Sequence, residues 1–243
     1  MQSCNQENKR ISKNTLLSTV IILFVIPLNI ALGVVYFDNK TIFIISLLIV
    51  LYTLIAFFAV FEKRKPQTRE LVIISTLSAV AVAGRAAFIM IPQFKPVIAI
   101  VIITGVCFGP TSGFLVGAIS AFVSNMFFGQ GLWTPWQMFC FGIIGFLAGV
   151  LFQKGVLSKQ RISLCIFGGI STIVIYGGII NFGSLMMFTK NFSWIALMAT
   201  YAAGIPFDLA HAVSTVFFLL IFSTPMIEIL DRIKKKYGLM EPN

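Results

Sequence analysis

Residues 112–153 read SGFLVGAISAFVSNMFFGQGLWTPWQMFCFGIIGFLAGVLFQ, and this stretch decides the fold class. It contains two apolar runs, 112–128 and 135–153, each close to the roughly 20 residues that a helix needs to cross about 30 Å of hydrocarbon. The connection between them carries two tryptophans, amide side chains and glycines. Amphipathic rings of this kind settle at the membrane surface, and amides there can bind a small molecule that arrives from water. The stretch therefore predicts two membrane-spanning helices joined at a surface that has a binding function.

The rest of the chain repeats this pattern. Of its 243 residues, 58% are hydrophobic and only 11% are charged. Apolar runs separated by short polar or Gly/Pro turns predict eight spans, near residues 15–36, 41–61, 69–91, 96–110, 112–128, 135–153, 161–187 and 199–225. We expect an all-α, multi-pass protein of the cell membrane, in which the fourth span is short.

The basic residues give the orientation. If the N-terminus is cytoplasmic, 14 of the 18 Lys and Arg residues lie at the inner ends of spans, and the other 4 are Lys40, Arg85, Lys95 and Lys190. This positive-inside bias places both termini in the cytoplasm. Topology and attraction to anionic lipid then explain the net charge of +10, so nucleic-acid binding is not indicated.

A charged segment at residues 62–70 divides the chain into two parts. The first part, 1–65, is a plain apolar hairpin, whose first span is too long for a signal peptide and is expected to be retained. The second part, 66–243, contains the remaining six spans and most of the polar residues within the membrane. We expect the second part to form the functional domain.

Small residues recur at helical spacing after residue 71 and predict close helix packing. They form three stripes: Ser75, Ala79 and Ala83; Gly113, Gly117 and Ala121; and Gly142, Gly145 and Gly149. Most such stripes pack a bundle internally, although one of them can instead dock a partner protein.

Ionisable residues inside a span are costly and mark candidate functional positions. Arg85 and Asp208 are expected at a similar depth, about 10–14 Å below the outer surface. They can form a buried pair that fixes helix register, border a ligand cavity, or do both. His211 shares a helix face with Asp208, and either a packed core role or a ligand contact fits it.

Enzymatic and metal chemistry are not predicted. A single histidine and four scattered cysteines support neither a metal site nor a disulfide framework. A Ser112–His211 hydrolase is disfavoured because the two residues are expected at different depths. No P-loop occurs, so any ATP-driven process needs another subunit. No catalytic residue, metal or cofactor is therefore assigned.

The remaining polar groups map mostly to the outer ends of several spans. An aromatic belt at the lipid headgroups explains each tryptophan taken alone, but it does not explain the amides and Arg85 at the same level. We therefore expect one outward-facing cavity, with the candidate substrate-binding residues Arg85, Gln93, Lys95, Asn125, Gln130, Trp133, Trp136, Gln137, Asn181, Asp208 and His211.

Several short strings resemble one family, the substrate-binding S components of energy-coupling factor (ECF) transporters. They are GRAAF at 84–88, PQFKP at 92–96, FVSN at 122–125, GQG at 129–131, WTPWQM at 133–138 and PFD at 206–208. The resemblance covers about residues 69–237 and is greatest for cobalamin-type members. It implies a six-helix, vitamin-binding subunit that works with a transmembrane coupling protein and two cytoplasmic ATPases.

The resemblance also implies roles for particular residues. Ser75, Ala79 and Ala83 look like the face that contacts the coupling protein, and the outward pocket would bind cobalamin or a related corrinoid. The same groups suit a flavin, a pterin or a queuosine precursor. The rivals are an ion-gradient-driven secondary transporter that needs no ATPase, and a membrane scaffold that binds no ligand.

Overall fold

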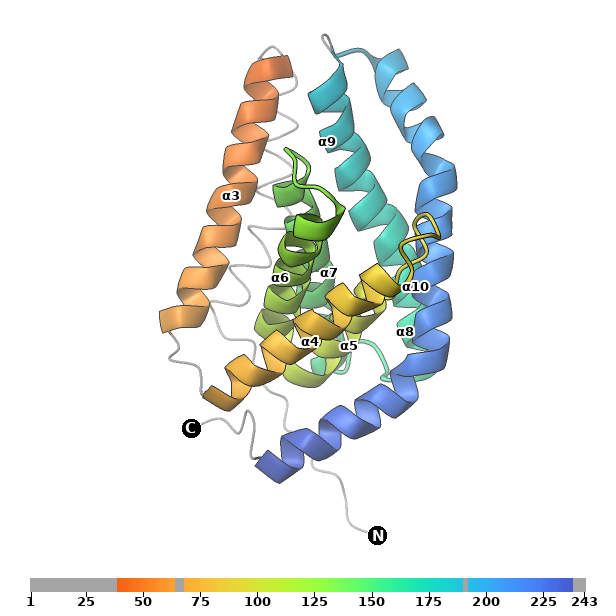
Figure 1. The fold of residues 1–243 in the computed structure, drawn as a ribbon. Coiled ribbons are helices and arrows are strands. Elements are labelled where there is room, and N and C mark those ends of the chain that lie inside the picture. Colours follow the sequence, from red (N-terminus) through yellow and green to blue (C-terminus); the bar gives the residue numbers. More distant parts are fainter. Residues whose placement is uncertain (1–38, 64–67, 190–191, 238–243) are drawn as a thin grey trace.

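The computed structural model spans residues 1–243, of which the structure describes 39–63, 68–189 and 192–237. The described part is helical (Figure 1) and consists of α3 (Asn39–Lys63), α4 (Thr68–Ala87), α5 (Val97–Phe108), α6 (Pro110–Phe128), α7 (Thr134–Gln153), α8 (Arg161–Ser171), the π-helix η2 (Thr172–Gly177), α9 (Gly178–Phe188) and α10 (Trp194–Tyr237). The all-α prediction is thus confirmed for these residues.

The short helix α5 lies at the centre of the bundle. All 12 of its residues are buried, because α4, α6, α7, α8 and α10 pack around it. Only Gly109, at φ 95°, separates it from α6, which begins with Pro110 at its first position. Proline is well suited to this position because the first turn of a helix has no use for its missing N–H. The expected fourth span is therefore a core helix that is covered on every side.

Two of the small-residue stripes hold α5, α6 and α7 together. A Cβ atom added to Gly145 would lie 2.3 Å from the backbone oxygen of Gly113, and one added to Gly105 would lie 2.2 Å from that of Gly145. Only glycine permits backbones to approach this closely. The prediction that the stripes on α6 and α7 pack the bundle internally is confirmed.

The third stripe differs. Ser75, Ala79 and Ala83 are exposed on α4, and α4 crosses the front of the bundle in Figure 1. This face has no partner within the described part of the chain, and its role in docking stays a prediction.

Five helical runs among the described residues are long and apolar enough to cross a membrane: α4, α6, α7, the continuous run Arg161–Phe188, and α10. The expected spans from 69–91 onward correspond to these runs and to α5. The expected first span, 15–36, lies outside the described residues. The count of eight spans and the location of the termini therefore stay predictions.

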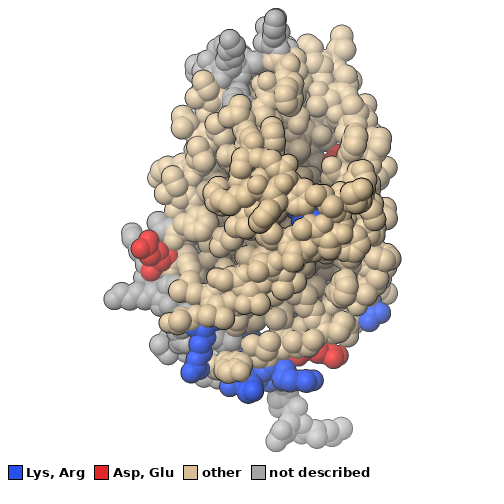
Figure 2. Space-filling model, in the orientation of Figure 1, with Lys and Arg blue, Asp and Glu red and all other residues tan. Residues whose placement is uncertain are grey.

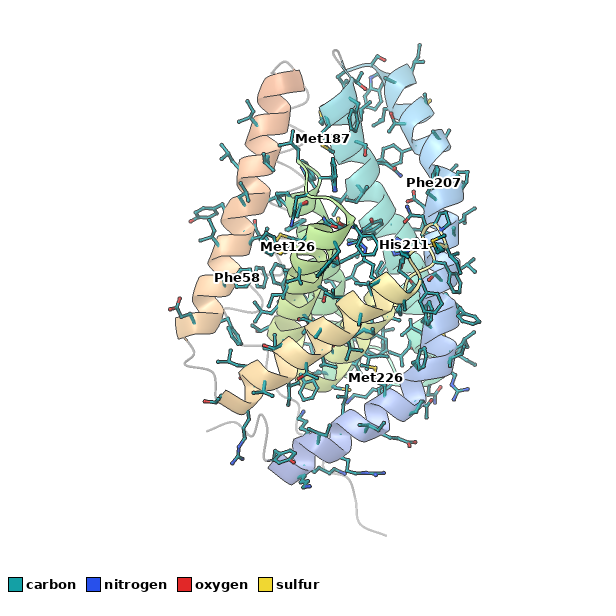
Figure 3. The ribbon with its side chains drawn as sticks, in the orientation of Figure 1. Phe58, Met126, Met187, Phe207, His211 and Met226 are labelled. Carbon is teal, nitrogen blue, oxygen red and sulfur yellow. The ribbon has the colours of Figure 1, made fainter. Side chains whose placement is uncertain are left out.

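The last helix is longer than the expected span 199–225. It contains 44 residues, includes Pro206 and Pro225, and bends so that its C-terminal part runs beneath the bundle (Figure 1). Met226 lies near the bend (Figure 3). Lys234 Nζ donates a hydrogen bond to the backbone oxygen of Cys107 at the end of α5 (3.2 Å). Basic residues gather along this lower end of the molecule (Figure 2), as the charge pattern predicts.

Helix α3, the described part of the N-terminal hairpin, packs against α6, α7 and α9. The ring of Phe57 stacks on that of Phe114, with centroids 3.8 Å apart and planes inclined by 12°. Val50 and Leu54 are buried in the same contact. The boundary at residues 65/66, drawn from the charge pattern, stays a prediction.

Candidate functional site

A cavity of about 190 Å³ lies among six helices and the loop that follows α4. Its lining comes from the end of α4, the start of α5, the end of α6, the first half of α7, η2 and the middle of α10. These residues are Arg85, Ile89, Pro92, Gln93, Lys95, Val97, Phe128, Gln137, Phe141, Tyr176 and His211. The end of α4 and the start of α7 are opposite to the helix ends that carry Lys154 and Lys234. The cavity therefore lies toward the end of the bundle that the charge pattern assigns to the outside.

A chain of polar contacts runs along one side of this cavity. Arg85 Nη1 donates to Ser124 Oγ (2.5 Å) and to Asn125 Oδ1 (2.8 Å). Asn125 Nδ2 donates to Gln137 Oε1 (2.8 Å), and Gln137 Nε2 donates to Tyr176 Oη (3.3 Å). Asn125 is only 1% exposed, so this network satisfies groups that water does not reach. It links α4, α6, α7 and η2.

An aromatic wall forms another side. The Tyr176 ring stacks on Phe141, with centroids 5.3 Å apart and planes inclined by 18°. It meets His211 edge to face, with centroids 4.6 Å apart and planes at 88°. Figure 3 shows His211 on α10 near the upper end of α4. Tyr176 belongs to the π-helix η2, a rare geometry that is frequent at functional sites.

His211 is buried, with 3% of its surface exposed, and its Nδ1 has no hydrogen-bond partner among the described residues. A buried polar atom without a partner is unfavourable unless something else satisfies it. His211 is also one of the residues that line the cavity.

The loop at residues 88–96 covers the cavity with Pro92, Gln93 and Lys95. Lys95 Nζ donates to the backbone oxygens of Phe88 and Ile91 and so ties the loop to itself. Ser214 Oγ on α10 donates to the Lys95 oxygen (3.0 Å) and anchors the loop to the bundle. Burial and, after it, the neighbouring Arg85 guanidinium lower the pKa of Lys95. Two basic side chains, Arg85 and Lys95, therefore line the cavity.

Five of the expected site residues line the cavity: Arg85, Gln93, Lys95, Gln137 and His211. Asn125 lies directly behind them and bridges Arg85 to Gln137.

The other expected residues lie elsewhere. Trp136 is 1% exposed and packs on Gly183, whereas Trp133 is 43% exposed and lies beside Gly131. Gln130 Nε2 donates to the backbone oxygen of Phe122 (3.0 Å) and borders a second, mainly apolar hollow against α3.

Asn181 and Asp208 form a separate pair. Asn181 Nδ2 donates to Asp208 Oδ2 at 2.7 Å. The pairing considered between Arg85 and Asp208 does not occur among the described contacts: Arg85 donates to Asn125, and Asp208 accepts from Asn181.

Three lining aromatics were missed in the sequence: Phe128, Phe141 and Tyr176. An aromatic residue within an apolar run has the same hydropathy signal whether it faces a ligand or the core. For Tyr176 a usable signal existed, since its hydroxyl needs a polar partner inside the membrane.

Among the described residues no group of three or more His, Cys, Asp or Glu side chains is placed to hold a metal ion. The groups available in the cavity are cations, amides, an imidazole and aromatic faces. They are suited to binding a polar, ring-containing molecule.

Comparison with known proteins identifies the family of the chain. The family described as "ECF-type riboflavin transporter, S component" matches residues 65–230. A UPF0397 protein of Vibrio atlanticus is 27% identical over 147 residues, which cover 54% of this chain and 80% of that protein. A UPF0397 protein of Aliivibrio salmonicida is 28% identical over 150 residues, with the same coverage. No solved structure matches significantly. With more than half of its length matched, the chain belongs to the family of S components of ECF-type riboflavin transporters.

Proposed function

We propose that this S component captures a compact, planar, heteroaromatic vitamin from outside the cell, with a flavin as the first candidate. The observation that carries the proposal is the cavity in which an aromatic wall, Phe141–Tyr176–His211, faces the same space as the amide of Gln137 and the guanidinium of Arg85. A flat ring with polar edges uses both kinds of surface, since its faces stack and its edges accept or donate hydrogen bonds.

The size of the cavity favours a small ring system. Its volume of about 190 Å³ is below the roughly 300–1,000 Å³ of typical ligand pockets. A three-ring flavin would need only a modest opening of the loop at 88–96. A corrinoid, favoured by the sequence resemblance, would require a far larger rearrangement. The family description adds support for the flavin.

The capture site would work with other subunits. The sequence has no P-loop of its own, so energy would come from a transmembrane coupling protein and two cytoplasmic ATPases. The exposed stripe Ser75, Ala79 and Ala83 on α4 is the proposed contact with the coupling protein. The small-residue stripes on α6 and α7 pack against neighbouring helices inside the bundle. The exposure of the α4 stripe, by comparison, supports its proposed role in docking.

Native mass spectrometry of the purified full chain tests the ligand class. Riboflavin, a pterin and cobalamin are each added, and we expect a stoichiometric adduct with riboflavin. A cobalamin adduct in place of it would overturn the flavin assignment and restore the corrinoid prediction.

Reconstitution tests the mode of transport. We expect vesicles that contain the chain alone to bind but not to accumulate the vitamin, and accumulation to require the coupling protein, the ATPases and ATP. Accumulation driven by an ion gradient with the chain alone would instead support a secondary transporter.

A further inference from the structure

Among the described residues that line it, the cavity has two cations and no acid. Arg85 and Lys95 both line it, and none of the lining residues is an Asp or Glu. Asp208 on α10, three residues before His211, accepts a hydrogen bond from Asn181 and is not among the lining residues. Cations that are partly withdrawn from water are stable when an anion compensates them.

The groups that now satisfy the two cations are neutral. Both hydrogen bonds of Arg85 within the described part of the chain are donated by Nη1, to a hydroxyl and an amide oxygen. The guanidinium has five N–H groups in a fork, so its Nη2 and Nε sides are left for another acceptor. In the part of the chain that the structure describes, Lys95 Nζ donates only to the backbone oxygens of Phe88 and Ile91.

A recess with basic atoms is visible in the middle of the face shown in Figure 2, apart from the basic lower end. The positive-inside rule accounts for the lower end but not for cations at the opposite end of the bundle. The buried Nδ1 of His211, which lacks a partner among the described residues, provides an independent sign that a polar ligand completes this site.

We propose that the substrate carries an oxyanion, a carboxylate or a phosphate, which is bound between Arg85 and Lys95 while its ring lies against Tyr176 and its edge bonds His211. The proposal rests on the proposed function and narrows its substrate class to anionic members. The guanidinium fork matches the two oxygens of such a group, and Lys95 adds a point charge from the loop.

Matched ligands test this. Riboflavin and flavin mononucleotide share a ring and differ by a phosphate, and a carboxymethyl flavin replaces the phosphate with a carboxylate. Affinity for the purified full chain is measured by flavin fluorescence at low and high salt. Because charge-assisted hydrogen bonds are roughly twice as strong as neutral ones, we expect one or both anionic flavins to bind at least about tenfold more tightly than riboflavin. This advantage should shrink with salt.

Substitutions of Arg85 and Lys95 test whether these two residues cause the tighter binding of anionic flavins. Arg85→Gln and Lys95→Gln should each weaken the binding of the anionic flavins more than that of riboflavin and so remove most of the anionic advantage, whereas the control Lys154→Gln, at the far end of α7, should change neither affinity. Lys95→Gln keeps the test valid if Arg85→Gln fails to fold. Equal affinity for neutral and anionic flavins, or equal weakening of both by the variants, would overturn the inference and leave the flavin proposal intact.

A pterin pair separates the two proposals. If flavins do not bind but a pterin carboxylate binds in an Arg85-dependent manner and its neutral parent does not, the flavin assignment fails and the oxyanion inference stands. The absence of binding by every flavin and pterin would overturn both.

Discussion

Arg85 Nη1 lies 2.8 Å from Asn125 Oδ1, and this contact sets the direction of the whole polar network. Because the Asn125 oxygen accepts from a group that can only donate, its Nδ2 must face Gln137. The Gln137 oxygen then accepts, and its Nε2 faces the Tyr176 hydroxyl. One cation thereby fixes the orientation of two amides and a phenol around the cavity.

Asn125→Ala interrupts this network. It leaves the amide oxygen of Gln137 and part of the Arg85 guanidinium without their partners, and each such buried group costs about 1–3 kcal/mol. We expect a clear drop in thermal stability together with weaker ligand binding. Ser120→Ala on the same helix is the control, because the buried Ser120 hydroxyl has no partner among the described residues and its loss should be neutral or slightly stabilising. Equal effects of the two substitutions would contradict the role of the network.

Tyr176→Leu removes an aromatic face from the cavity wall. Aromatic pairs contribute about 0.5–1.5 kcal/mol beyond their burial, so we expect a loss of ligand affinity of roughly threefold to tenfold, which titration can measure. Tyr176→Phe should retain most of the affinity because the ring is kept. Tyr201→Leu is the matched control, since Tyr201 bonds the Gly178 oxygen and does not line the cavity. If Tyr201→Leu weakens ligand binding as much as Tyr176→Leu does, the effect does not come from the aromatic wall of the cavity.

Gly145→Ala should prevent stable folding. The added Cβ would lie 2.3 Å from the backbone oxygen of Gly113. Relief of this contact would require the backbone of α6 to move away from α7. Overpacking typically costs about 1–3 kcal/mol and occasionally more, and a contact this short with backbone belongs at the upper end of that range. Size-exclusion chromatography after expression would detect the loss of folded protein. In contrast, a Cβ added to Gly178 meets nothing within 4 Å. Gly178→Ala should therefore stabilise the helix by up to about 1 kcal/mol.

Ala79→Trp tests the exposed stripe on α4. A bulky side chain there should block association with the coupling protein and leave vitamin binding unchanged, because Ala79 is exposed and is not among the cavity-lining residues. Ala202→Trp, at an exposed position of α10, is the control for a bulky group in the membrane. Co-purification with the coupling protein is the measurement, and an intact complex with Ala79→Trp would refute the assignment.

Hydropathy predicted the helices that consist of an uninterrupted apolar run. The runs 112–128 and 135–153 correspond closely to α6 and α7, because polar or Gly/Pro residues stop each run near its end. The end of α10 was not predicted, since charged residues after Pro225 resemble a loop in sequence but form a helix that packs Leu230 against the core.

The site was predicted in part for similar reasons. Charged and amide residues inside spans stand out, so Arg85 and Gln137 were found. Trp136 was expected near the membrane surface, but it is buried against Gly183, because a tryptophan at the start of a span has the same sequence signal in both settings. The hydroxyl of Tyr176 is a sequence signal for a polar contact, but the local π-helix to which Tyr176 belongs is not predicted by any residue pattern.

That change of helix type has a consequence for how the specificity of such a protein can evolve. One residue corresponds to about 100° of rotation in an α-helix, so a single-residue deletion within Thr172–Gly177 would turn the Tyr176 ring away from the cavity while α8 and α9 stay helical. Chain length at this one position, together with the side chains that line the cavity, would then influence which ligand the wall accepts. Aligned relatives that differ by a one-residue gap here should differ in their cargo.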